Sequence, residues 1–191
     1  MGSTYWAPPL IFLIDTIFSL YIFALVLRFL FQWSGADYQN PVSQLLIQIT
    51  HPPLKLVRRF VPSLGRVDAA SLVLMLLLEM TAGFLIFKIQ GASPSAGVLG
   101  IWAITQLLEL VLNIYFYAIL IRALLSWVGP TVYNPAVSLL FSLTEPLLTL
   151  SRRILPMTGG IDLSPLVPIV VIQLVRMLLL PPLQELALLL N

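Results

Sequence analysis

Four charged side chains stand inside long apolar runs of this sequence: Asp15, Glu79, Glu109 and Arg176. A charge at the centre of a membrane costs about 2.5–3.5 kcal/mol, so such residues either pair with one another or take part in ion movement. Glu109 and Arg176 would enter the membrane from opposite sides to compatible depths, which favours a structural ion pair between them. A proton or cation path, or positions that face headgroups or water, remain as alternatives.

A second chemical signal is a basic, amphipathic stretch that occurs twice, at residues 50–59 (THPPLKLVRR) and 144–153 (TEPLLTLSRR). Cations on such a helix point toward lipid phosphates while the apolar face enters the acyl boundary. Arginines near the ends of spans also reach phosphate groups. The predicted headgroup-binding residues are Lys55, Arg58, Arg59, Arg152, Arg153, Arg28 and Arg122. The alternatives are that these cations only set the topology, or that they form a surface for a protein partner.

The two stretches belong to a tandem repeat with an offset of 94 residues. Residues 21–73 and 115–167 share 21 identities in 53 positions, without a gap, which indicates a duplication. The shared motif residues predicted to be structural are Trp33, Asn40, Pro41, Thr50, Pro52 and Asp68, with Trp127, Asn134, Pro135, Thr144, Pro146 and Asp162. The repeat pairs Asp15 with Glu109, but it pairs Glu79 with Gln173 and Arg176 with Ala82.

Composition places the chain in a membrane. Hydrophobic residues make up 59% of the 191 residues, charged residues only 9%, and the mean hydropathy is +1.00; soluble domains carry about 25% charged residues. The sequence predicts an all-α integral membrane protein with four transmembrane helices. They come from two tandem parallel repeats, and each repeat has a cytoplasmic broken amphipathic helix between its two spans.

The predicted organisation is a first repeat at 8–90, a short periplasmic turn at 91–97, a second repeat at 98–182 and a tail at 183–191. Pro8 and Pro9 are expected to start the first span, and Pro181 and Pro182 to stop the last. Thr50 is expected to cap a second short helix after a break in the amphipathic stretch. Asp68 and Asp162 are expected to cap the second span of each repeat.

Charge predicts the orientation. Six cations lie between the spans of the two repeats, whereas the turn between the repeats offers only Lys88. Short loops rich in Lys and Arg stay in the cytoplasm. Both amphipathic stretches are therefore expected in the cytoplasm, and both termini in the periplasm.

These motifs resemble the YggT family, also called YlmG, of small bacterial and plastid membrane proteins. The matching parts are Arg28-x4-Trp33, Asn40-Pro41, Thr50-x-Pro52-Leu-x3-Arg58-Arg59 and Asp68, and the same set 94 residues later. The second copy closes with Asp162-Leu-Ser164-Pro165, whereas the first reads Asp68-Ala-Ala70-Ser71. The resemblance implies a bacterial inner-membrane protein without enzyme activity, linked to osmotic tolerance or to cell-envelope and division functions.

The sequence offers no pattern for an enzyme or a cofactor. It has one histidine, His51, and no cysteine, and it lacks nucleotide-binding fingerprints. The net charge of +2 is too small to indicate nucleic-acid binding. The expected function is a scaffold or regulator that binds anionic phospholipid and presents a surface to membrane or cytoplasmic protein partners. The alternative is a small potassium or proton channel or transporter that acts as a homo-oligomer.

Overall fold

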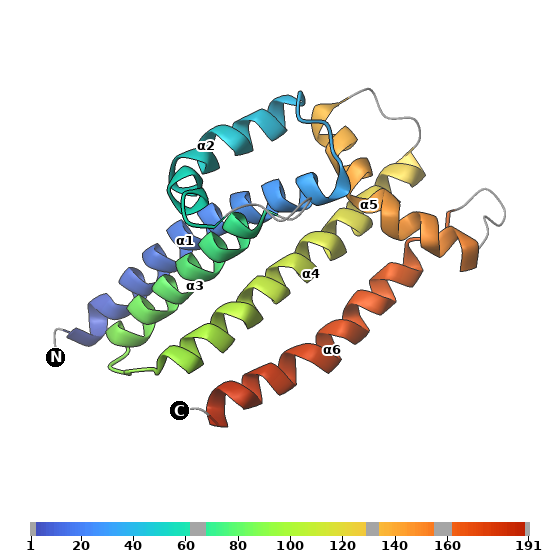
Figure 1. Ribbon diagram of the computed structural model, residues 1–191. Helices are drawn as coiled ribbons and strands as arrows, with labels where there is room; N and C mark the ends of the chain where they lie inside the picture. The colour runs from blue at the N-terminus through green and yellow to red at the C-terminus, as the bar shows by residue number, and fades with distance from the viewer. Residues whose placement is uncertain (1–2, 62–67, 129–133, 155–161, 190–191) are drawn as a thin grey trace.

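The computed structural model describes residues 3–61, 68–128, 134–154 and 162–189, and its described part consists of helices and their connections (Figure 1). The helices are α1 (Ser3–Ser34), α2 (Pro41–Arg58), α3 (Ala69–Ile89), α4 (Ala96–Val128), α5 (Pro135–Ile154) and α6 (Leu166–Leu189). Within this part, α1, α3, α4 and α6 are long and apolar enough to cross a membrane. The predicted all-α fold with four spans is therefore confirmed.

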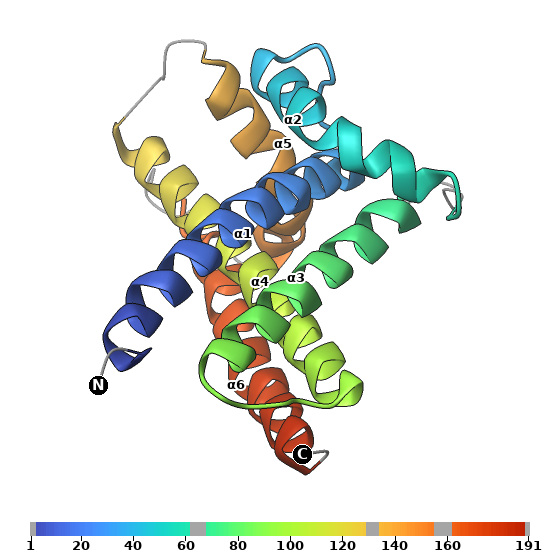
Figure 2. The same ribbon diagram turned by 90° about the vertical axis from the view of Figure 1, so that its left-hand side faces the viewer.

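The four long helices pack in chain order, α1 on α3, α3 on α4 and α4 on α6. The amphipathic helices α2 and α5 both lie at the end of the bundle opposite the two chain termini (Figures 1 and 2). Each repeat thus contributes two long helices with a short helix at the same end. This is the arrangement of two parallel repeats.

The interior is small because most apolar side chains face outward, as expected for helices surrounded by lipid. Only 17% of the most apolar stretch of α1 is buried. The main core joins Ile22 and Leu25 of α1 to Leu54 of α2, Met75 of α3 and Ile114 of α4. A second cluster in the other repeat joins α4, α5 and α6.

Helices α3 and α4 approach closely at Gly83, which lies against Trp102. A Cβ atom on Gly83 would stand 2.7 Å from the Cε3 atom of Trp102. The ring of Trp102 also meets Phe87 edge to face, with 6.1 Å between the ring centroids. The absence of a side chain at Gly83 is therefore what lets the second helix of one repeat pack against the first helix of the next.

The predicted break in the first amphipathic stretch is wrong. Helix α2 runs from Pro41 to Arg58 through Pro52 and Pro53. Thr50 is fully buried inside this helix, and its hydroxyl donates to the carbonyl oxygen of Leu46 over 2.6 Å, so it does not act as a cap. The N-cap of α2 is Asn40, whose side-chain oxygen accepts from the backbone N–H of Val42 over 2.9 Å.

The helix boundaries predicted from Pro8 and Pro9 and from Pro181 and Pro182 are also wrong. Helix α1 begins at Ser3, before Pro8 and Pro9, and α6 continues through Pro181 and Pro182 to Leu189. An interior proline removes its own N–H donor and crowds the carbonyl group four residues earlier, at a cost of about 3 kcal/mol. Unwinding the backbone in lipid would leave several polar groups unpaired, each at a cost of several kcal/mol. A continuous helix is the less costly solution.

Candidate functional site

The chemistry of this chain is concentrated where the short helices meet the long ones. In the first repeat, Arg28 of α1 donates from its Nη1 atom to the hydroxyl of Thr50 on α2 over 2.7 Å. A separate ion pair joins Arg58, near the end of α2, to Asp68, which stands before α3. Asp68 also accepts from the hydroxyl of Ser71 over 2.8 Å. The described residues therefore hold two unconnected polar links here.

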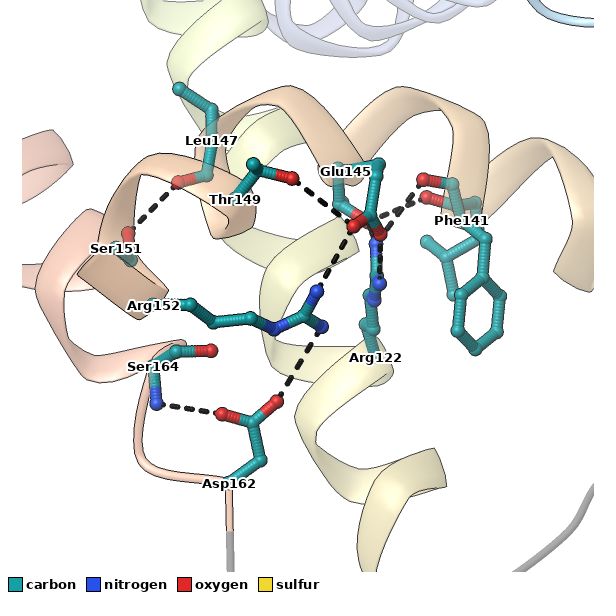
Figure 3. A network of polar contacts seen from close by, with 11 residues as sticks. Arg122, Phe141, Glu145, Leu147, Thr149, Ser151, Arg152, Asp162 and Ser164 are labelled. Carbon is teal, nitrogen blue, oxygen red and sulfur yellow. Dashed lines mark hydrogen bonds and ion pairs between the residues drawn. The ribbon is translucent and has the colours of Figure 1, made fainter. Parts of the chain in front are cut away.

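The second repeat repeats the first link and adds to it (Figure 3). Arg122 of α4 donates to the hydroxyl of Thr144 over 2.8 Å and to the carbonyl oxygen of Phe141 over 3.2 Å. Its guanidinium also forms an ion pair with Glu145 and lies 4.4 Å from the ring centroid of Phe141. Arg122 is only 6% exposed, and these contacts supply the partners that a buried cation requires.

Arg152 extends this arrangement to the last span. Its Nη1 atom lies 3.0 Å from Oε1 of Glu145, and its Nη2 atom lies 3.6 Å from Oδ2 of Asp162. The other Asp162 oxygen accepts from the backbone N–H of Ser164 over 2.9 Å. We call the series Arg122, Glu145, Arg152 and Asp162 the second-repeat network (Figure 3). It connects α4, α5 and the approach to α6.

The pKa values of the three carboxyl groups reflect these partners. Hydrogen bonding from Arg122 holds the pKa of Glu145 below its ordinary value. Burial tends to raise the pKa of Asp68, but the hydrogen bonds from Arg58 and Ser71 outweigh burial and lower it. Burial also tends to raise the pKa of Asp162, but the hydrogen bonds from Ser164 and the charge of Arg152 outweigh burial and lower it. All three groups are thus stabilised in their charged forms.

The predicted cap at Asp68 differs from the structure. Asp68 occupies the N-cap position of α3, but its carboxylate is taken up by Arg58 and Ser71 rather than by a helix N–H. Asp162, the cap predicted for the last span, accepts from the backbone N–H of Ser164, before α6 begins at Leu166.

The motif residue Asn134, for which no capping role was predicted, accepts from the backbone N–H of Ala136 over 2.9 Å, as Asn40 does for α2. Asn40 also donates from Nδ2 to the carbonyl oxygen of Pro135 over 2.8 Å. This contact joins the first turns of α2 and α5 across the two repeats.

The remaining motif residues have simpler positions. Pro41 and Pro135 are the first residues of α2 and α5, where the missing N–H is tolerated. Pro146 lies inside α5, as Pro52 does inside α2. Trp33 is 58% exposed at the end of α1, where an aromatic residue at a membrane boundary is expected. The side chain of Trp127 lies outside the described residues.

The predicted headgroup residues fall into two groups. Arg28, Arg58, Arg122 and Arg152 donate to the protein itself, as described above. Lys55, Arg59 and Arg153 are exposed and have no hydrogen bond or ion pair with any described residue. Contact with lipid headgroups stays a prediction for all seven residues. The second group could make this contact without giving up a hydrogen bond or ion pair inside the protein.

The predicted ion pair between Glu109 and Arg176 is wrong, because Arg176 donates to the side-chain oxygen of Asn113 instead. Glu109 lies one helical turn from Asn113 on the same face of α4, but no described cation pairs with it. Arg176 extends from α6, and its reach depends on the rotation of both helices, which spacing alone does not determine. Asn113 was not among the residues singled out from the sequence.

Glu145 is the other residue that sequence reasoning missed. It is the central group of the second-repeat network, yet it occupies the position of His51 in the repeat alignment. The sequence did contain a signal. Glu145 lies seven residues, about two helical turns, before Arg152, and it is a carboxylate where the first copy has a histidine. Among the described residues, no three or more His, Cys, Asp or Glu side chains come together as a group that could hold a metal ion.

The fold and these networks define a multi-pass helical membrane protein built from two parallel repeats. The family model for CCB3/YggT matches this chain twice, at residues 7–89 and 101–183. The chain therefore belongs to the CCB3/YggT family.

Several relatives support this assignment. "Uncharacterized protein PA0392" of Pseudomonas aeruginosa is 38% identical over 170 residues, covering 88% of this chain and 86% of the relative. "Uncharacterized protein YggT" of Escherichia coli K12 is 33% identical over 168 residues, covering 88% and 87%. "Uncharacterized protein in proC 3'region" of Vibrio alginolyticus is 36% identical over 171 residues, covering 88% and 91%. No solved structure matches the chain.

Proposed function

We propose that this protein is a non-enzymatic scaffold or regulator of the bacterial inner membrane whose helices α2 and α5 rest on anionic phospholipid. The observation that carries the proposal is the set of exposed cations that the protein does not use internally: Lys55, Arg59 and Arg153. Lys55 lies on α2, Arg59 directly follows α2, and Arg153 lies on α5; both helices are at the same end of the bundle (Figure 2). Each basic residue near an anionic membrane surface contributes about 1 kcal/mol to binding.

Apolar side chains beside these cations support a position at the lipid boundary. Leu56 and Phe60 are 70% and 81% exposed near Lys55 and Arg59, and Ile154, directly after Arg153, is 67% exposed. The opposite face of α2 is buried against the protein through residues such as Leu46 and Leu54. A helix with this pattern can place apolar groups at the acyl boundary and cations at the phosphates.

The orientation follows from the same cations. Short basic segments remain cytoplasmic, so α2 and α5 would face the cytoplasm and both termini the periplasm. The surface around α2 and α5 would then be available to membrane or cytoplasmic protein partners. A role in osmotic tolerance or in envelope and division functions is what the family resemblance implies for such a scaffold.

The test replaces Lys55, Arg59 and Arg153 together by Gln in the full chain. The purified variant should retain less phosphatidylglycerol and cardiolipin than the wild type, measured by mass spectrometry of co-purified lipid. The loss should shrink as salt is raised, because exposed charges are screened. In intact cells, a cysteine at exposed Gln48 should resist a membrane-impermeant maleimide.

The control is Lys88→Gln, which removes an exposed cation from the opposite end of the bundle, near the turn that follows α3. Lys88→Gln should leave lipid retention unchanged. Equal retention by the triple variant and the wild type would refute lipid anchoring. Strong labelling at position 48 from outside would refute the orientation.

A second candidate function is ion movement by a homo-oligomer, and one observation favours it. Asp15 and Glu79 lie within spans and have no hydrogen bond or ion pair with any described residue. Four spans enclose little room in one chain, so a path would require several copies. Liposomes containing the protein should then pass potassium or protons, and Asp15→Asn should reduce that flux. Absence of flux above that of empty liposomes would remove this candidate.

A further inference from the structure

Helix α2 has one buried face and two different exposed faces. The buried face packs on the protein through Leu46 and Leu54. At 3.6 residues per turn, the exposed apolar residues gather on a second face: Leu45, Ile49 and Leu56. The third face is polar. An exposed helix with an apolar face beside a polar one suits the boundary between acyl chains and headgroups.

The polar face carries three basic side chains, His51, Lys55 and Arg59, which we call the basic row. They are four residues apart, so each lies about 6 Å further along the helix axis than the last and about 40° around it. Arg59 directly follows α2 and keeps helical backbone angles, φ −66° and ψ −29°. All three side chains are exposed and have no hydrogen bond or ion pair with any described residue.

Neighbouring groups do not neutralise the basic row. Helix α2 contains no Asp or Glu, and α1, α3 and α5 pack against it. The titratable or charged groups that contact α2, or that lie on α5, are Tyr21, Arg28, Asp68, Glu145, Arg152 and Arg153. Asp68 pairs with Arg58, and Glu145 pairs with two arginines of its own repeat. Neither carboxylate forms an ion pair with the basic row.

The charge of the basic row depends on pH. Lysine and arginine stay charged near neutral pH, whereas free histidine has a pKa of about 6.5. The row therefore carries two positive charges at about pH 7.5 and three at about pH 5.5. Lipid phosphodiesters keep their negative charge over this range, so only the protein side of the contact changes.

We propose that the basic row binds the phosphate groups of anionic lipid, and that protonation of His51 strengthens this binding. The inference rests on the proposed lipid anchoring and adds its regulation. One further cation near an anionic surface should strengthen binding about fivefold. The gain is present below about pH 6.5 and is lost as the pH rises above it.

The second repeat supplies an internal comparison. The positions equivalent to the basic row hold Glu145, Thr149 and Arg153. Only one of the three is basic, and α5 contains no histidine. Hydrogen bonding from Arg122 keeps the pKa of Glu145 below its ordinary value, so that carboxylate stays charged at pH 5.5. Acidification should therefore strengthen lipid binding at α2 and leave it unchanged at α5.

The experiment uses the full-length protein in phosphatidylcholine nanodiscs that contain increasing shares of phosphatidylglycerol with a nitroxide quencher on its acyl chain. The chain has no cysteine, so a single introduced cysteine carries one fluorophore. Leu56→Cys on α2 and Leu150→Cys on α5 are equivalent positions, 70% and 60% exposed. Half-maximal quenching at α2 should require about fivefold less phosphatidylglycerol at pH 5.5 than at pH 7.5. At α5 the two values should agree.

Two variants assign the effect to His51. His51→Gln should remove the pH dependence at α2 and respond to phosphatidylglycerol as the wild type does at pH 7.5. His51→Lys should respond at both pH values as the wild type does at pH 5.5, because its charge is permanent in this range. Nitroxide-labelled phosphatidylcholine serves as the control lipid and should quench equally at both pH values.

Two results would overturn the proposal while leaving lipid anchoring intact. One is a preference for phosphatidylglycerol at α2 that is the same at pH 7.5 and pH 5.5. The other is a gain on acidification that is equal in the wild type and in His51→Gln. Failure of lipid anchoring itself looks different: phosphatidylglycerol would then quench no more than phosphatidylcholine, at either label and either pH, and both proposals would fall.

Discussion

The two repeats hold their short helices by the same arginine and threonine, yet they differ in how far the polar contacts extend. In the second repeat, Glu145 joins Arg122 to Arg152, and Arg152 reaches Asp162. In the first, His51 stands in the place of Glu145, so the link from Arg28 to Thr50 ends there. One residue thus decides whether a repeat has a continuous network or two separate links.

Burial gives the physical reason for this difference. Arg122 is 6% exposed and requires a carboxylate to balance its charge. Arg28 is less buried, so solvent or headgroups can reach it, and it donates a hydrogen bond to the hydroxyl of Thr50. The comparison shows that the shared motif residues set the geometry of both repeats, whereas unshared residues such as Glu145 determine how tightly each is held.

Acid should have the largest effect on this comparison. The pKa values of Asp68, Glu145 and Asp162 lie below their ordinary values. Their stabilisation is therefore present above the unfolded pKa values, about 3.9 for Asp and 4.3 for Glu, and is lost as the pH falls through the folded values. Thermal unfolding in detergent should shift to lower temperature below about pH 4.

The repeats should respond unequally to acid. Two of the three carboxyl groups belong to the second-repeat network, so α5 should lose more protection from hydrogen exchange than α2. Equal loss in the two helices, or a melting temperature that is unchanged down to about pH 3, would contradict this interpretation.

Removing the central carboxylate should have the next largest effect. Glu145→Gln leaves Arg122 buried without a counter-charge and should lower the free energy of unfolding by about 2 kcal/mol. Breaking a fully buried pair costs more, but Glu145 is 46% exposed, so solvent compensates in part. Chemical denaturation of the reconstituted protein measures the change.

The matched control is His51→Gln at the equivalent position of the first repeat. His51 is exposed and makes no contact with Arg28 or Arg58 that the structure records. Its replacement should change stability by less than about 0.5 kcal/mol. If Glu145→Gln and His51→Gln lowered the free energy of unfolding equally, the network of the second repeat would add nothing to stability.

The smallest expected effect concerns the caps of α2 and α5. Asn40→Ala removes both a helix cap and the hydrogen bond to Pro135, and should cost about 1.5 kcal/mol. Asn134→Ala removes only a cap at an exposed position and should cost about 0.5–1 kcal/mol. Urea unfolding of the two variants compares them directly; a larger loss for Asn134→Ala would show that the link between repeats adds nothing.

The sequence was sufficient to predict what depends on hydrophobic length and on repetition. The four spans, the two parallel repeats and the separate short helices follow from runs of apolar residues and from the offset of 94 residues. The continuity of α2 through Pro52 did not follow, because it depends on contacts with α1 that the sequence does not show. Thr50 is fully buried and accepts a hydrogen bond from Arg28 of α1. Leu46 and Leu54 are buried on either side of it, so packing holds the helix together across Pro52.

The pairing of individual side chains was harder to predict. Arg176 reaches Asn113 rather than Glu109, although both residues of α4 lie on one face. A long side chain can reach either of two groups one turn apart, and a small rotation of α6 decides between them. Glu145 was not predicted because a carboxylate on an amphipathic stretch is ordinary in a sequence, and only the fold brings it against the buried guanidinium of Arg122.

The close approach at Gly83 has no counterpart in the second repeat. The equivalent position there is Met177, which is 69% exposed on α6. At Gly83 the bare backbone receives the rigid ring of Trp102, whereas Met177 presents a flexible, polarisable side chain to the surface. The first repeat therefore offers a fixed, shape-specific contact at this position, and the second offers a deformable one.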